Sequence, residues 1–140
     1  MGLDISHGAW SGSYCSFDRF RCAVAKACGG SFPPHADPNL DPAYWYIDSE
    51  FQEPKGGPKW GPDGELAWKW SGLFELLNHP DHTGWISSTV CAVLARNLRD
   101  LREKIEANLR VVGHIKSDTL TRFIAGCELA AEREEELVFS

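Results

Sequence analysis

Prolines divide this chain into a part that can be helical and a part that cannot. Seven of the eight prolines lie between residues 33 and 62, and proline in a helix interior removes a backbone donor and clashes with the preceding turn. No long helix can form there. Within this region, residues 43–48 and 66–70 are aromatic strand candidates, whereas residues 53–64, rich in proline and glycine, predict an exposed loop.

The N-terminal residues predict a strand followed by a helix. Leu3 and Ile5 alternate with polar residues, which is typical of a short half-buried strand. A turn rich in glycine and serine is expected at residues 8–13. From residue 14 to residue 28, apolar side chains recur every three or four positions, as on an amphipathic helix, and Ser13 is its predicted N-cap.

The C-terminal half predicts two long helices. An apolar stripe between Val90 and Val112 steps by three and four residues, which predicts one continuous helix of about 24 residues and ~36 Å. Ser87 or Ser88 is its expected cap, and Gly113 its end. A final helix follows Ser117, and because the link is short the two helices should pack antiparallel as a hairpin.

Together these elements predict one domain over residues 1–140, of the α+β class. We expect a small irregular aromatic-rich sheet packed on the long antiparallel helical hairpin, with the N-terminal helix added to it. The formal net charge is −6. Because nucleic-acid binding requires a basic surface, this charge argues against a protein that coats DNA or RNA.

Compartment signals point to the cytoplasm. The N-terminus has no secretory signal pattern, and no apolar run approaches the ~20 residues that a bilayer crossing needs, so we expect no membrane association. The five cysteines form no Cys-x-x-Cys pair, and four of them lie on apolar or nearly apolar helix stripes. Reduced thiols are therefore expected.

The first candidate site lies where the predicted strand meets the first helix. Backbone N–H groups of the turn and the positive end of the helix dipole would face a phosphate or a carboxylate. Serine hydroxyls add donors, a histidine and an arginine add charge, and aromatic rings can stack on a base or a sugar. The alternative is a capped helix with aromatic anchors in the core and no ligand. The candidate residues are His7, Trp10, Ser11, Ser13, Tyr14 and Arg21.

The second candidate site is the loop from His79 to Trp85, which would close the same ligand pocket. Two imidazoles and a carboxylate lie within four residues, at His79, Asp81 and His82. With His7 they could alternatively ligate zinc or another divalent ion. The same residues also read as a simple turn before the next helix.

Two blocks of the sequence resemble a family of small uncharacterised bacteriophage and prophage proteins. The first is MGLDISHGAWSGSY with Phe17 and Arg21, and the second is the Leu-Leu-Asn-His-x-Asp-x-x-Gly block at residues 76–84. The chain departs from the second block at His82 and Thr83, where the family often carries a cysteine and a second acidic residue. The resemblance implies a phage-borne cytoplasmic role, of a host-interaction or counter-defence kind, and no catalytic residue.

The leading hypothesis is a non-enzymatic binding protein that sequesters a small anionic nucleotide-like ligand, without a cofactor. No Gly-x-Ser-x-Gly elbow is present, and no cysteine has a histidine beside it, so no catalytic residue is expected. Small proteins often build such sites between subunits, so we expect a homo-oligomer. One alternative is a metal-dependent hydrolase that uses the His79–His82 loop. Another is an inhibitor that presents the Trp-rich segment 44–70 to a host protein.

Overall fold

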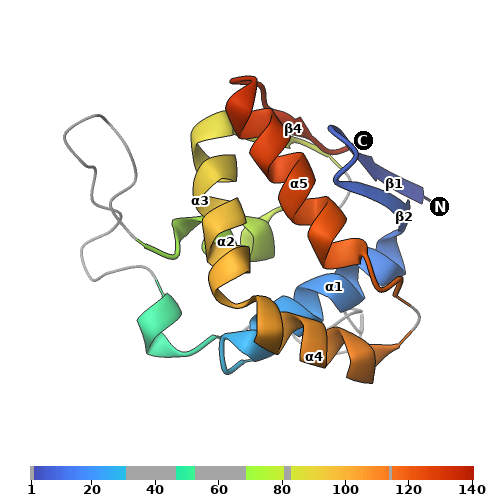
Figure 1. Cartoon of the computed structure of the whole chain (residues 1–140), viewed down its shortest axis with the longest axis vertical. Coiled ribbons are helices and arrows are strands. Elements are labelled where there is room, and N and C mark those ends of the chain that lie inside the picture. Colours follow the sequence, from blue (N-terminus) through green and yellow to red (C-terminus); the bar gives the residue numbers. More distant parts are fainter. Residues whose placement is uncertain (1, 31–46, 53–68, 81–82, 114) are drawn as a thin grey trace, which may run out of the picture.

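The computed structural model describes residues 2–30, 47–52, 69–80, 83–113 and 115–140 (Figure 1). Within these ranges the chain forms five α-helices and two small antiparallel sheets, which confirms the α+β class. The aromatic strands expected at 43–48 and 66–70 fall mostly outside the described residues. The elements are β1 (Gly2–Ile5), β2 (Trp10–Ser13), α1 (Tyr14–Ala27), the 3-10 turn η1 (Ser49–Phe51), α2 (Ser71–Asn78), β3 (Trp85–Ile86), α3 (Ser88–Asp100), α4 (Arg102–Val112), α5 (Thr119–Glu132) and β4 (Leu137–Val138).

The N-terminal residues form a β-hairpin that leads directly into α1. The glycine- and serine-rich turn expected at residues 8–13 is shorter than predicted, because Trp10 to Ser13 pair with β1 as a second strand. The reversal is made by His7 and Gly8, whose φ angles are 61° and 71°. Positive φ at both central residues matches the twist of a two-residue hairpin. Ser13 caps α1 as predicted, since its hydroxyl accepts a hydrogen bond from the Ser16 amide at 3.1 Å.

The single long helix expected over residues 88–112 is wrong. The chain bends at Leu101, whose φ and ψ are −104° and 10°, and continues as α4. Helix α3 lies beside α5, whereas α4 turns away and packs on α1 (Figure 1). The predicted hairpin is therefore formed by α3 and α5. Periodicity missed the bend because one non-helical residue leaves the apolar spacing intact, and the two halves bury their stripes against different partners.

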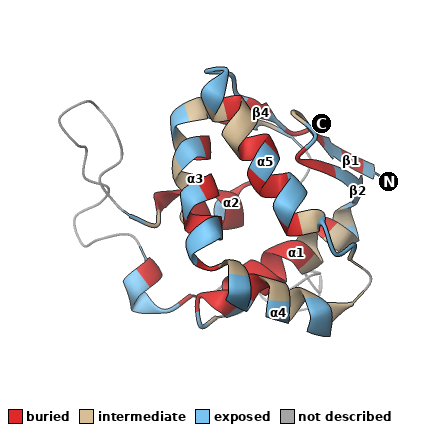
Figure 2. Cartoon of the chain, in the orientation of Figure 1, coloured by how far each residue is buried: buried red, intermediate tan, exposed pale blue. Residues whose placement is uncertain are grey.

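One hydrophobic cluster runs from Leu3 to Phe139 and takes residues from every helix (Figure 2). Its aromatic centre joins β2, α1 and α5. Trp10 meets Phe17 edge-on with ring centroids 5.1 Å apart, and Phe20 lies 5.1 Å from Phe123. Such ring pairs add stability beyond the area they bury.

The two ends of the chain are joined by backbone hydrogen bonds. Asp4 N donates to Ser140 O at 2.9 Å, and Ser140 N donates back to Asp4 O at 2.8 Å. Ser6 N also donates to Val138 O at 2.9 Å. The last residues therefore lie beside β1, and the termini meet on one side of the molecule (Figure 1).

The start of α2 is held by a side chain from α3. Ser71 is the first helical residue, and its buried hydroxyl has no hydrogen-bond partner among the described residues. The fully buried Asn97 of α3 bonds the backbone on both sides of this residue. Its Oδ1 accepts from Leu73 N at 3.3 Å, and its Nδ2 donates to Lys69 O at 2.7 Å. The α3 helix, far along the chain, thus fixes where α2 begins.

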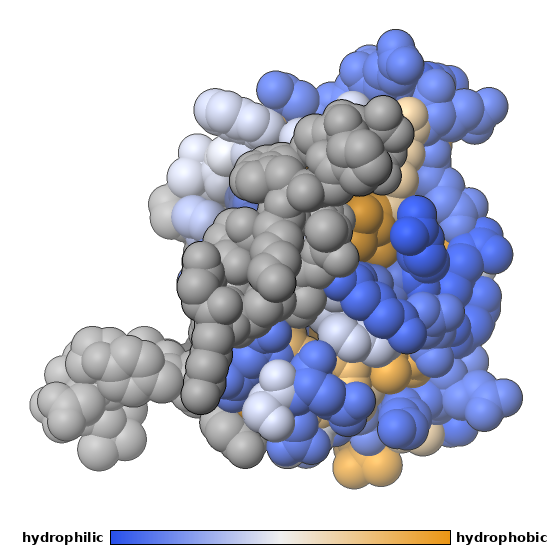
Figure 3. Space-filling view, turned by 90° about the vertical axis from the view of Figure 1, so that its left-hand side faces the viewer, coloured by the Kyte–Doolittle hydropathy of each residue, from blue (hydrophilic) through white to orange (hydrophobic). Residues whose placement is uncertain are grey.

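The face of the molecule seen in Figure 3 is largely hydrophilic where it is described. Viewed from the left of Figure 1, blue side chains predominate and hydrophobic residues form smaller patches between them (Figure 3). Trp85, Val111 and Val138 are the exposed large hydrophobic side chains in the described ranges. None of the helices there combines the length and hydrophobicity that crossing a bilayer would require.

Helix α5 approaches the hairpin turn closely because residue 126 is glycine. A Cβ placed on Gly126 would lie 2.5 Å from the Ala9 Cβ and 2.7 Å from the Ala9 Cα. Real Cβ atoms do not come that close, and neither Ala9 atom can swing aside. The glycine therefore sets the distance between α5 and the turn.

We expect Gly126→Ala to lower the free energy of unfolding by about 1–2 kcal/mol, because overpacking costs more than the helix propensity that alanine gains. Chemical denaturation measures this change. The control Ala125→Leu adds bulk at an exposed position beside it and should change stability by less than about 0.5 kcal/mol. A Gly126→Ala variant as stable as the parent would contradict the close approach of α5 to Ala9.

Candidate functional site

A pocket of about 320 Å³ opens where the hairpin meets the N-terminal ends of α1 and α5. Residues 8–12 form one wall, and Ser16 of α1 lies beside them. The opposite wall comes from the α4–α5 connection and the first turn of α5. The volume of the pocket is near the lower end of the roughly 300–1,000 Å³ seen for small-molecule sites. The residues of the α5 wall are Ile115, Lys116, Thr119 and Arg122.

The charged side chains that line this pocket are cationic. Lys116 and Arg122 both line it, and no acidic side chain is among its described lining residues. Asp118 lies 3.8 Å from Arg122, but both side chains are more than half exposed, so this ion pair is weak. The first turn of α5 adds the positive end of its helix dipole, and no side chain caps that end. An anionic group would be stabilised here.

Two of the predicted ligand residues, Trp10 and Ser11, line this pocket. Ser11 is exposed, whereas the Trp10 side chain is almost wholly buried against the core. Ser13 lies next to the pocket as the α1 cap, and its hydroxyl is 2.9 Å from that of Ser16. Tyr14 is half-buried and packs against the hydrophobic core rather than lining the pocket.

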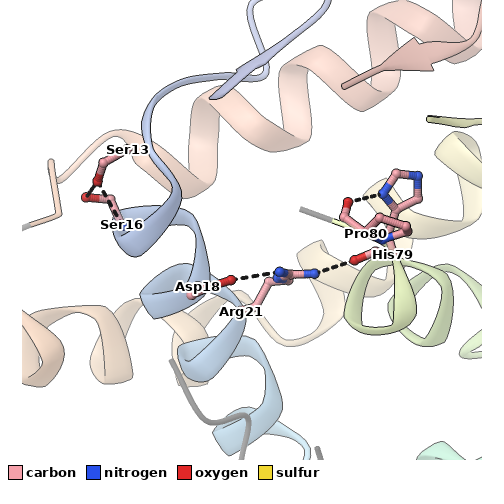
Figure 4. Close-up of polar contacts among 6 residues, drawn as sticks. All are labelled: Ser13, Ser16, Asp18, Arg21, His79 and Pro80. Atoms are coloured by element: carbon pink, nitrogen blue, oxygen red, sulfur yellow. Dashed lines mark hydrogen bonds and ion pairs between the residues drawn. The ribbon is translucent and has the colours of Figure 1, made fainter. Parts of the chain in front are cut away.

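Arg21, a predicted ligand residue, does not line this pocket. Its side chain is buried, with Nη1 donating to His79 O at 2.6 Å and Nη2 donating to Asp18 at 2.7 Å. Figure 4 shows it pointing from α1 toward His79, away from the Ser13–Ser16 pair. The helical period explains the burial of Arg21, because residue 21 follows Phe17 by four positions and shares its buried face.

His79 is likewise held within the fold. Its Nδ1 lies 2.6 Å from Pro80 O and its Nε2 lies 3.2 Å from Trp85 O. The ring also stacks on Phe139 at a centroid distance of 4.0 Å. Both ring nitrogens therefore face backbone carbonyls rather than a ligand, and His79 does not line the pocket.

The remaining predicted site residues do not line the pocket or lie outside the described residues. Asp81 and His82 fall outside the described ranges. Trp85 is on β3 and is 60% exposed. His7 lies at the hairpin turn, with Nδ1 2.8 Å from the Ser6 hydroxyl and Nε2 3.7 Å from Glu135. Across the described part of the chain, no three His, Cys, Asp or Glu side chains are grouped as metal ligands.

Sequence reasoning missed the cationic wall of the pocket. Lys116, Thr119 and Arg122 lie more than a hundred residues after the hairpin that they face. One signal was available: a lysine, a threonine and an arginine surround the start of a predicted helix, which is the same pattern that suggested a site at α1. The sequence does not tell whether the hairpin lies over the start of α1 or the start of α5, because the tertiary structure decides this.

Four of the five cysteines are buried, and Cys15 alone is exposed. Burial, reinforced by the carboxylates of Glu50 and Asp48, raises the pKa of the Cys28 thiol to about 12. Burial also raises the pKa of Cys22. The thiols of Cys91 and Cys127 share a hydrogen bond, which lowers the pKa of the first and, together with burial, raises that of the second. These buried thiols are parts of the core.

We expect only Cys15 to react quickly with a chromogenic disulfide reagent at about pH 8, because buried neutral thiols are poor nucleophiles. The other four should react after denaturation. Counting released thiolate with and without denaturant measures both classes. Cys15→Ser should abolish the fast phase, and a second fast thiol in the native protein would contradict the burial described above.

No protein-family model, curated protein or solved structure matches this chain significantly. The resemblance to phage proteins therefore rests on the two sequence blocks themselves.

We expect Arg21→Ala to destabilise the fold by about 2–4 kcal/mol, because it leaves a buried carbonyl and a half-buried carboxylate without their cation. Thermal and chemical denaturation report the loss. Arg19→Ala, a less buried arginine on the same helix, is the matched control and should have a much smaller effect. If Arg21→Ala is nearly as stable as the parent, Arg21 does not stabilise the fold and stays a candidate ligand contact.

Proposed function

We propose that this protein is a non-enzymatic binding protein that takes a small anionic, nucleotide-like ligand in the pocket between β2, α1 and α5. One observation carries the proposal. Lys116 and Arg122 face a pocket that has an aromatic and hydroxyl-bearing wall, and no carboxylate among its described lining residues opposes them. Two cations beside an uncapped helix N-terminus form a suitable binding site for a phosphate.

Hydroxyl groups on two sides support the same ligand class. Ser11 on β2 and Ser16 on α1 lie on one side of the pocket, and Thr119 on α5 lies on the other. They can donate to phosphate or sugar oxygens. The described lining side chains pair no nucleophile with an imidazole or a carboxylate, which favours binding over turnover.

The biological setting is part of this proposal. The two sequence blocks that resemble phage proteins suggest a phage-encoded protein of the host cytoplasm that withdraws a nucleotide-like signal in counter-defence. Homo-oligomerisation would let a neighbouring subunit add to a pocket that is small and open in one chain.

Isothermal titration calorimetry with nucleoside 5′-monophosphates, their cyclic forms and their triphosphates tests the proposal directly. We expect at least one nucleotide to bind, and to be recovered uncleaved after heat denaturation of the complex. The double variant Lys116→Ala/Arg122→Ala should bind roughly 100-fold more weakly, since each charge-assisted hydrogen bond contributes appreciable binding energy.

The matched control is Lys26→Ala/Arg133→Ala, which removes the same charge from exposed positions at the far ends of α1 and α5. It should bind like the parent. Absence of binding by every nucleotide, or equal affinity in the two double variants, would reject the proposed function. Recovery of a cleaved product would show that the protein is an enzyme instead.

A further inference from the structure

The indole N–H of Trp10 is an unused hydrogen-bond donor in the wall of the pocket. The Trp10 side chain is nine-tenths buried, with 9% of its surface exposed, and its Nε1 has no hydrogen-bond partner among the described residues. Buried donors are almost always paired, because an unpaired one forfeits its bond to water. A donor left unpaired in the wall of a positive pocket points to an acceptor on the ligand.

Gly12 places no side chain against the edge of this indole ring. Residues 10 and 12 lie on the same face of β2, since side chains alternate along a strand. A Cβ placed on Gly12 would meet Trp10 first, at 3.4 Å from Nε1 and within 3.8 Å of two neighbouring ring carbons. Both residues line the pocket. A larger residue at position 12 would therefore lie in van der Waals contact with the buried N–H group, whereas glycine leaves that position without a side chain.

The charge and the size of the pocket limit how many phosphates it suits. Lys116 and Arg122 supply two positive charges, and a phosphate monoester carries about −1.5 to −2 near neutral pH. One phosphate group therefore balances the two cations. A triphosphate would bring additional negative charge, for which the described lining residues offer no further cation, into a pocket of only about 320 Å³.

We infer that the ligand is a small organic monophosphate whose phosphate lies between Lys116 and Arg122 and whose remaining part accepts a hydrogen bond from Trp10 Nε1. This inference rests on the proposed function and makes it more specific. Trp10 contacts the organic part of the ligand, whereas the α5 wall binds its phosphate group. Inorganic phosphate should then bind at the α5 wall alone and weakly.

The test follows the indole N–H signals in proton–nitrogen NMR spectra while nucleoside monophosphates, nucleoside triphosphates and inorganic phosphate are added in turn. The Trp10 signal is assigned with Trp10→Phe. A monophosphate should shift the Trp10 signal strongly, because it accepts the hydrogen bond from Trp10 Nε1. It should bind about tenfold more tightly than its triphosphate, whose additional negative charge the two cations do not balance. Inorganic phosphate should leave the Trp10 signal in place.

Gly12→Val keeps the test independent of changes to the core. It covers the indole edge from a strand position, so it should weaken monophosphate binding about tenfold while binding of inorganic phosphate stays unchanged. Gly2→Val is the matched control, because its Cβ would meet no atom closer than Gly12 O at 3.7 Å on the same hairpin.

The outcomes separate the two proposals. Nucleotide binding without a Trp10 shift, a tighter triphosphate, or Gly12→Val affinity equal to that of Gly2→Val would overturn the monophosphate inference and leave the proposed function standing. If no nucleotide binds at all, the proposed function fails and the inference fails with it.

Discussion

Aromatic packing between the N-terminal hairpin and two helices far apart in sequence determines the rest of this structure. Trp10 of β2 lies on Phe17 and Phe20 of α1, and Phe20 lies on Phe123 of α5. Large rings bury much apolar area and prefer tilted or edge-on contacts. Once these rings pack, β2, the start of α1 and the start of α5 must converge, and the candidate pocket lies at that convergence.

The charged residues near this core divide into two groups with different roles. Arg21 is buried; its hydrogen bond to His79 O ties α1 to the end of α2, and its second bond goes to Asp18 on α1 itself. Lys116 and Arg122 stay at the surface of the pocket, where a ligand can reach them. A buried cation is satisfied by fixed partners, whereas cations in an open pocket can accept a diffusing anion. Burial thus separates structural arginine from candidate ligand-binding residues.

Much of the local structure could be predicted, and the reasons are visible at individual residues. Ser13 and Ser87 cap α1 and α3 as expected, and Gly113, with φ of 71°, ends α4 as expected. The bend at Leu101 could not be foreseen, because the apolar spacing continues through it. The candidate site was half predicted: the hairpin wall with Trp10 was found, and its cationic partner on α5 was not.

The amino-acid sequence by itself determined the class of the fold, the ends of its helices and the aromatic and hydroxyl wall of the pocket. These depend on interactions between residues a few positions apart, which capping, glycine conformation and apolar periodicity report directly. Only the tertiary structure decided that Arg21 is buried and that Lys116 and Arg122 face Trp10. Those facts depend on which faces of distant helices pack together, and local spacing does not encode that choice.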